Sequence, residues 1–167
     1  VRIVDPATSV DLGPWQEGEL IVRGPNVMVG YHNKPTETAA ALKNGWYHTG
    51  DLAKADANGY LTITGRLKEL IIRGGQNIAP GEVEEAVLRH PAILDCAAVG
   101  VEHKHLGEIP VVFVVLREGK SVEADALIEF TKAHLSAYKV PAEIHVVKEI
   151  PRTGSGKVMR FKLKETI

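Results

Sequence analysis

The chain has 167 residues, of which 44% are hydrophobic and 25% charged, as is usual for a globular protein. Its net charge of −1 excludes a strong whole-molecule field that would attract nucleic acid or a membrane surface. No apolar run reaches the roughly 18 residues needed to span a bilayer, and no signal peptide is visible.

The N-terminal third contains short β-branched segments bounded by Gly, Pro or Asp, a pattern typical of strands. The expected strands are Val1–Val4, Glu19–Arg23, Gly50–Lys54 and Tyr60–Thr64. The turn Asp56-Ala57-Asn58-Gly59 predicts that the last two form a hairpin. One helix is expected over Lys34–Leu42, with Thr36 as its cap.

After Gly65 the pattern changes to alternating strands and helices. The expected strands are Glu69–Arg73, Ala97–Val101, Ile109–Leu116 and Glu143–Lys148, and the expected helices are Pro80–Arg89, Ala124–Ser136 and Val158–Glu165. Ile109–Leu116 is nearly all apolar, which predicts a central strand buried on both faces. The order from Glu69 to Lys148 is therefore β-α-β-β-α-β, a compact α+β unit.

Cys96, the single cysteine, lies in an apolar, strand-like run. A buried, unreactive thiol is the expectation, and the absence of a disulfide framework fits a reducing, cytoplasmic setting. His103 and His105 have no Cys or acidic partner at metal-ligand spacing, so no metal site is predicted. The chain begins at Val1 inside an expected strand, and we expect it to be a piece of a longer protein.

Near the C-terminus, the loop Pro151-Arg152-Thr153-Gly154-Ser155-Gly156-Lys157 combines backbone N–H groups, hydroxyls and an ammonium group. Glycine leaves such a run little intrinsic structure, yet this set of groups suits an oxyanion or a phosphate. Residues 152–164 contain five basic residues and no acidic one. A solvated helix face is the alternative interpretation of that run.

Four segments in order carry a family resemblance. They are Gly18-Glu19-Leu20 through Gly30-Tyr31-His32-Asn33-Lys34-Pro35, Gly45-Trp46-Tyr47-His48-Thr49-Gly50-Asp51, Gly65-Arg66-Leu67-Lys68 through Gly74-Gly75-Gln76-Asn77-Ile78-Ala79-Pro80-Gly81-Glu82-Val83-Glu84, and the loop ending at Lys157. Together they resemble the C-terminal portion of the adenylate-forming superfamily, which includes acyl-CoA synthetases, luciferases of the firefly type and peptide-synthetase adenylation domains.

The resemblance implies two domains. Residues 1–66 resemble the end of the large AMP-binding domain, a small β-rich piece like a distorted barrel. Residues 67–167 resemble its C-terminal lid, with a hinge near 66–69. The implied reaction joins a carboxylate to ATP as an acyl-adenylate and then transfers the acyl group to coenzyme A, while the lid rotates between the two steps.

Site residues follow from matching positions. Asp51 matches the aspartate that accepts hydrogen bonds from the ribose hydroxyls, and Arg66 matches an arginine that contacts the nucleotide. Lys68 falls at the hinge. Lys157 matches the lysine that stabilises charge during adenylation. A turn aspartate, a surface arginine and solvated lysines are the alternatives.

Gly74 and Gly75 match the loop that lines the tunnel for the pantetheine arm of coenzyme A, where a side chain would obstruct the approach. A plain turn is the alternative. The resemblance also implies that Mg²⁺ and the acyl pocket belong to the large domain, and that a protein lysine acetyltransferase acts at Lys157. The fragment alone is expected to be inactive.

Within the superfamily, Gly74–Pro80 resembles acyl- and aryl-CoA ligases more than peptide-synthetase domains. We therefore expect an acid–thiol ligase. Enzymes of this class act in fatty acid metabolism, among other settings. A stand-alone lid that acts on a partner in trans is the non-enzymatic alternative, and a peptide-synthetase adenylation domain is the enzymatic one.

Overall fold

A computed structural model describes all residues, 1–167, and the chain divides into two compact units, Val1–Lys68 and Glu69–Ile167. Each unit has its own sheet. The assignment of residues 1–66 and 67–167 to two enzyme domains stays a prediction. No helix in the structure has both the length and the hydropathy required to cross a membrane.

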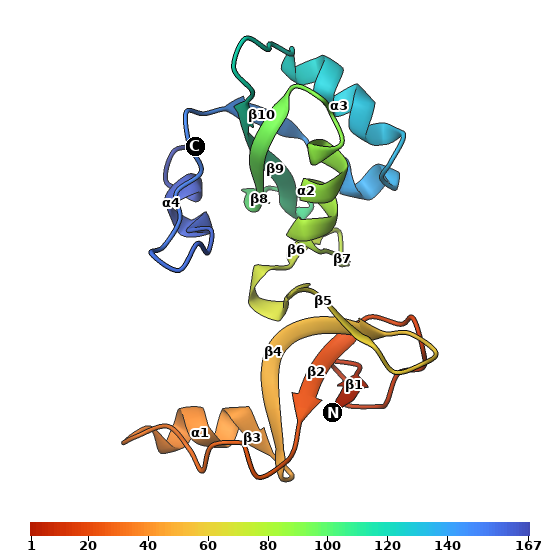
Figure 1. Ribbon diagram of the computed structural model, residues 1–167, viewed down its shortest axis with the longest axis vertical. Helices are drawn as coiled ribbons and strands as arrows, with labels where there is room; N and C mark the ends of the chain where they lie inside the picture. Colours follow the sequence, from red (N-terminus) through yellow and green to blue (C-terminus); the bar gives the residue numbers. More distant parts are fainter. The chain divides into compact units, whose positions relative to one another are not determined.

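The first unit is a curled antiparallel sheet in which a long strand, β4, bends along its length (Figure 1). The order is β1-β2-β4-β3, and β5 also pairs with β4. The strands are β1 (Arg2–Val4), β2 (Gly18–Val22), β3 (Leu42–Lys43), β4 (Trp46–Ala55) and β5 (Leu61–Arg66). Register shifts along β4 accompany this curvature.

The predicted hairpin between residues 50 and 64 is confirmed, because β4 and β5 pair across the turn at Asp56. The Asp56 carboxylate accepts hydrogen bonds from the backbone N–H groups of Asn58 and Tyr60, and Gly59 supplies the positive φ. Helix α1 spans Pro35–Ala41, with Pro35 at its first position. The predicted Thr36 cap is wrong, because Thr36 lies inside the helix and its N-cap position is Lys34.

The second unit places helices on a five-stranded sheet. Its elements are β6 (Ile71–Arg73), β7 (Gln76–Ile78), α2 (Pro80–Leu88), β8 (Ile93–His103), β9 (Gly107–Leu116), α3 (Ala124–Lys132), β10 (Glu143–Val146) and α4 (Arg160–Lys164), with short 3-10 turns at Leu67–Glu69 and Ala137–Lys139. The α+β class is confirmed. The predicted order lacked β7, which pairs with β6 as a hairpin.

Strand β9 is the centre of this sheet, as predicted, because it pairs with β6, β8 and β10. Its side chains alternate between two cores. Val112 and Val114 pack in the core that α2 and α3 help to form, whereas Val111 and Phe113 pack with Ile150 and Leu163 of the C-terminal segment. The segment around Lys157 is therefore anchored on one face of the sheet.

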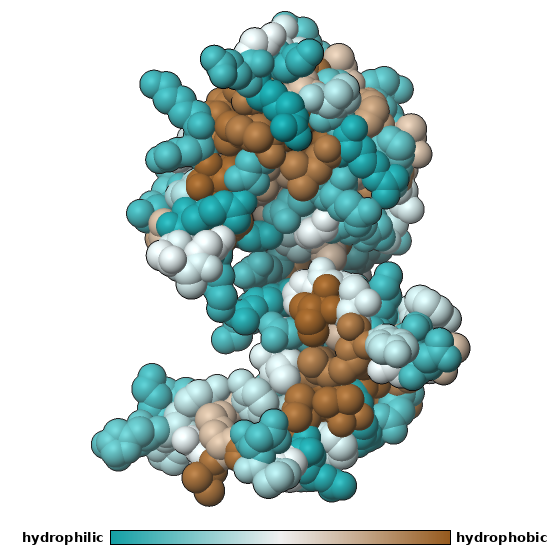
Figure 2. Space-filling view, in the orientation of Figure 1, coloured by the Kyte–Doolittle hydropathy of each residue, from teal (hydrophilic) through white to brown (hydrophobic).

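Hydrophobic side chains remain exposed on the first unit, as the brown surface in Figure 2 shows. Three of them adjoin or belong to β5: Tyr60, Leu61 and Ile63, the last 57% exposed. Such a concentration of exposed apolar residues on one strand is typical of a contact surface.

Candidate functional site

Asp51 and Arg66 lie directly opposite each other on β4 and β5. The Arg66 Nε is 2.9 Å from the Asp51 Oδ1, and both side chains remain accessible to solvent. Arg66 is 54% and Asp51 29% exposed, so a ligand can reach both groups. The pair therefore offers acceptors and donors to a ligand with hydroxyl and anionic groups.

The segment before Asp51 is fixed by a buried carboxylate. Glu19, on β2, is only 7% exposed. Its Oε2 is 2.7 Å from the His48 Nδ1, and its Oε1 accepts a hydrogen bond from the Gly50 N–H at 3.1 Å. Next to them, the Thr49 hydroxyl donates to the backbone carbonyl of Leu20 and accepts from the N–H of Asp51.

Sequence reasoning missed the role of Glu19 and treated His48 only as a strand residue. A signal existed, since Glu19 is a charged residue in the otherwise apolar strand Gly18–Val22. A charge at such a position is expected to have a polar partner, because burial of an unpaired charge is costly.

A groove of about 520 Å³ adjoins this segment. Its lining includes Glu19, Tyr31, Tyr47, His48 and Gly50, and it extends to Leu67 and Lys68 of the same unit. A hydrogen bond with the Tyr31 hydroxyl raises the pKa of Tyr47, and burial raises it further by a smaller amount. The groove is therefore bordered by aromatic rings and by polar groups of the part of β4 that precedes Asp51.

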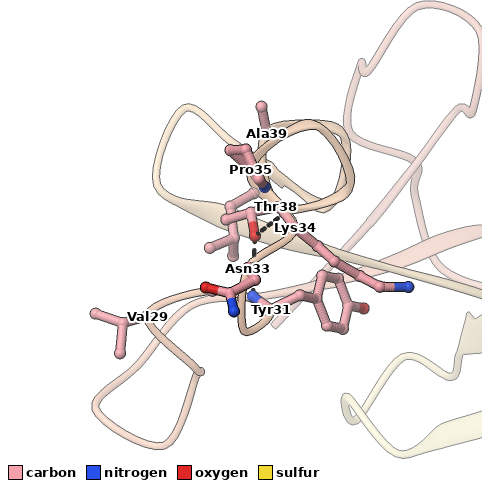
Figure 3. Close-up of a pocket in the computed structure, with 9 residues that line it drawn as sticks. Val29, Tyr31, Asn33, Lys34, Pro35, Thr38 and Ala39 are labelled. Carbon is pink, nitrogen blue, oxygen red and sulfur yellow. Dashed lines mark hydrogen bonds between the residues drawn. The ribbon is translucent and has the colours of Figure 1, made fainter.

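A second hollow of about 480 Å³ lies beside the start of α1 (Figure 3). Its wall is stabilised by Thr38, whose hydroxyl accepts a hydrogen bond from the Tyr31 N–H and donates one to the Lys34 carbonyl. Because Tyr31 and Lys34 also line the larger groove, the two hollows share one wall.

Lys68 is an exposed residue in the 3-10 turn Leu67–Glu69, and the boundary between the two units follows it directly. It has no ion-pair partner in the chain, and its hinge role stays a prediction.

Gly74 and Gly75 form the two-residue turn between β6 and β7. Their φ angles are +57° and +80°, the combination that a type I′ hairpin turn requires. A Cβ on Gly75 would meet no atom of the chain within 4 Å. The backbone conformation alone therefore accounts for glycine here, and the role in a tunnel stays a prediction.

Lys157 ends a loop that is more ordered than its glycine content suggested. The Thr153 N–H donates to the Lys157 carbonyl, and the Thr153 carbonyl accepts a hydrogen bond from the Gly156 N–H. The Thr153 hydroxyl accepts a third hydrogen bond from the Lys157 N–H. The Lys157 side chain is exposed, and its ammonium group has no ion-pair partner in the chain. A fixed backbone thus carries a free positive charge.

The predicted residues fall in both units: Asp51, Arg66 and Lys68 in the first, and Gly74, Gly75 and Lys157 in the second. The structure brings Asp51 and Arg66 into contact. No group of three or more His, Cys, Asp or Glu residues is arranged to hold a metal ion.

Comparison with known proteins gives consistent matches. Residues 82–157 match the family described as the AMP-binding enzyme C-terminal domain. Over 149 residues the chain is 48% identical to the sulfoacetate–CoA ligase of Cupriavidus necator. The aligned region covers 89% of this chain and 29% of that protein. The chain thus spans about a third or less of the length of the curated relatives it matches.

Solved structures agree with this match. ATP-bound MatB from Rhodopseudomonas palustris superposes with a TM-score of 0.94 at 34% identity, over 99% of this chain and 33% of that chain. The amide bond synthetase McbA from Marinactinospora thermotolerans superposes with a TM-score of 0.92 at 31% identity, over 100% of this chain and 34% of that chain.

Proposed function

The chain belongs to the adenylate-forming enzymes, whose C-terminal domain it carries, and from this we propose that it is the C-terminal part of an ATP-dependent acyl-CoA ligase. In the first half-reaction a carboxylate oxygen attacks the α-phosphorus of ATP, and pyrophosphate leaves. In the second, the coenzyme A sulfur attacks the acyl carbonyl. AMP then leaves, and the thiol proton passes to solvent.

The observation that carries this proposal is the cross-strand pair of Asp51 and Arg66 beside a groove of about 520 Å³. A carboxylate suits a vicinal diol because its oxygens can accept from both hydroxyls, so we assign Asp51 to the ribose. Arg66 offers its exposed guanidinium group to the nucleotide, and its planar fork matches phosphate oxygens.

Lys157 supplies the charge for the first half-reaction. Negative charge grows on the phosphate and carboxylate oxygens as the new bond forms, and a positioned ammonium stabilises that transition state more than the ground state. The free ammonium group on an ordered loop supports this role. Acetylation would remove the charge, so an acetyltransferase acting at Lys157 would switch the enzyme off.

The second half-reaction uses the other loop of the same unit. We assign the turn at Gly74 and Gly75 to the path of the pantetheine arm, and Lys68 to the hinge about which the lid turns between the steps. An exposed lysine stays solvated in both poses, which suits a hinge position.

The rest of the large domain of the same enzyme, beyond the piece in residues 1–66, is the proposed partner. The exposed apolar residues on and beside β5 support it, because such a surface is typical of a protein contact. Mg²⁺ accompanies ATP in this reaction and is assigned to the large domain, as is the carboxylate pocket. The cytoplasm remains the proposed location.

A second candidate function is amide formation, in which an amine replaces coenzyme A as acceptor. The likeness to the amide bond synthetase favours it. The test incubates the intact protein with ATP, Mg²⁺ and a panel of carboxylates, with either coenzyme A or amines, and measures pyrophosphate and products by mass spectrometry. Thioester products support the ligase, amides support the second candidate, and absence of pyrophosphate throughout overturns both.

The chain of 167 residues is tested separately in the same assay, where no pyrophosphate release is expected. Turnover by this chain alone would contradict the assignment of the carboxylate pocket to the large domain. Turnover that appears only when a separately expressed large domain is added would support the lid that acts in trans.

A further inference from the structure

The loop at Lys157 is attached to its unit by two arginines, one at each end. Arg152 and Val158 pair as an isolated antiparallel bridge, and the N–H of Met159 bonds to the carbonyl of Pro151. These contacts close residues 152–158 into a small hairpin-like loop. Its ends must therefore be anchored if the lysine is to keep one place on the unit.

The first anchor is Arg152. Its Nη2 donates to both oxygens of Asp95, at 2.9 Å each, and its Nη1 donates to the Gly156 carbonyl at 3.0 Å. Asp95 belongs to β8, and its Oδ1 also accepts the N–H of Cys96. One guanidinium thus joins the residue before Lys157 to a strand of the sheet.

The second anchor is Arg160, three residues beyond Lys157. Its Nη2 donates at 2.8 Å to the Oε1 of Glu84 on α2, and that oxygen also accepts the N–H of Ala98. Burial raises the pKa of the Glu84 carboxyl, although Arg160 opposes that shift. The Nε of Arg160 lies 3.5 Å from Glu69, the first residue of the second unit.

Apolar packing against β9 holds the same segment on the sheet. Ile150 precedes the loop and Leu163 follows it in α4, and both are buried against Val111 and Phe113 of β9. Helix α4 lies beside β8 (Figure 1). Between these two contacts the loop projects with an exposed tip, and the ammonium group of Lys157 has no partner of its own.

We propose that Arg152 and Arg160 are positioning residues that hold the Lys157 loop in one geometry for adenylation. The proposal rests on the proposed function. Neither arginine need touch the substrates, since the guanidinium donors described above point to Asp95, Gly156 and Glu84. A displacement of about 1 Å of a catalytic group can lower a rate on the order of 10²-fold, so anchoring has a kinetic consequence.

The proposal predicts an asymmetry between the two half-reactions. Lys157 serves only the first, so loss of an anchor should lower adenylation and spare thioester formation from a supplied acyl-adenylate. A variant that merely unfolds the lid would impair both steps.

The main variant is Arg152→Gln. The Arg152 side chain is 40% and its partner Asp95 34% exposed, so the substitution does not leave a deeply buried charge without a partner. The matched control is Arg89→Gln, which breaks the exposed pair between Glu85 on α2 and Arg89, the C-cap residue of that helix. Arg152→Lys keeps the charge but cannot reach both Asp95 oxygens and Gly156 together, so partial recovery is expected.

In the intact enzyme, Arg152→Gln should lower the adenylation rate on the order of 10²-fold and keep the rate of the thioester step within about twofold of the unmutated enzyme. The control Arg89→Gln should remain active in both steps. Equal loss in both steps, or none, would overturn the proposal. An unmutated enzyme that releases no pyrophosphate would instead overturn the proposed function.

A second measurement uses the chain of 167 residues and needs no activity. Hydrogen exchange of the amides of Gly156 and Lys157 should accelerate at least tenfold in Arg152→Gln and stay unchanged in Arg89→Gln. Unchanged exchange in Arg152→Gln would show that the anchor does not hold the loop, and would overturn the proposal whatever the kinetics. Arg160→Lys repeats the test at the second anchor without removing its charge.

Discussion

Substitution of Gly75 separates two explanations for the glycines at the turn between β6 and β7. Its φ of +80° places an L-residue in the left-handed region, which costs about 1–2 kcal/mol. An added Cβ meets no atom within 4 Å, so no steric cost is added. Alanine also reduces the entropy of the unfolded chain, which offsets about 0.4–1 kcal/mol. Gly75→Ala should therefore destabilise the second unit by about 1 kcal/mol.

Gly119 provides a matched control, because its φ is +69° and a Cβ there also meets nothing within 4 Å. Gly119→Ala should cost the same amount. Urea unfolding followed by circular dichroism measures both. Tryptophan emission reports the first unit alone, since Trp15 and Trp46 both lie there, and should not shift. A loss above about 3 kcal/mol for Gly75→Ala, or no loss, would refute this reasoning.

Asparagine extends the test to function, since it tolerates the left-handed region better than alanine does. Gly75→Asn should be nearly as stable as the unmodified chain. If the turn borders the path of coenzyme A, this variant should still slow the thioester step of the intact enzyme, whereas Gly119→Asn should not. Normal thioester formation by Gly75→Asn would leave the turn geometry as the whole reason for the glycine.

Three further outcomes follow from buried groups. Gly18→Ala should cost about 1–3 kcal/mol, measured by tryptophan emission in urea, because its Cβ would lie 2.4 Å from the Val4 carbonyl oxygen. His48→Ala should cost a similar 1–3 kcal/mol or so by the same assay, because buried Glu19 loses a partner. Burial raises the pKa of Cys96 to about 12, so alkylation at pH 8 should require unfolding. The unfolded thiol, with its pKa of 9.0, ionises first, so the contribution of Cys96 to the free energy of unfolding should be constant below pH 9 and fall by up to about 1.4 kcal/mol per pH unit toward pH 12, and Cys96→Ala should remove this part of the pH dependence.

The elements with strong patterns were predictable from the sequence. The apolar run 109–116 indicated a central strand because burial on both faces removes the polar alternation, and β9 confirms it. The turn at Asp56–Gly59 indicated a hairpin through its own turn chemistry. The missed strand, Gln76–Ile78, has only three residues, two of them exposed and polar, so no periodicity reveals it. The pair of glycines before it was the available signal.

The candidate site was less accessible to sequence reasoning, because its geometry depends on residues far apart in the chain. Asp51 and Arg66 meet only through the register of β4 and β5. The pair of Glu19 and His48 spans 29 positions, and the anchor between Arg152 and Asp95 spans 57. Sequence reasoning also expected little structure around Lys157, since it did not include the bonds that Thr153 and Arg152 supply.

If Lys157 serves adenylation alone, Lys157→Ala in the intact enzyme should impair only the first half-reaction. The two half-reactions are measured separately, by pyrophosphate release and by thioester formation from a supplied acyl-adenylate. Adenylation should fall on the order of 10²–10³-fold, while thioester formation should stay within about twofold of the unmodified rate. Adenylation at the unmodified rate, or an equal fall in both half-reactions, would contradict this role of Lys157.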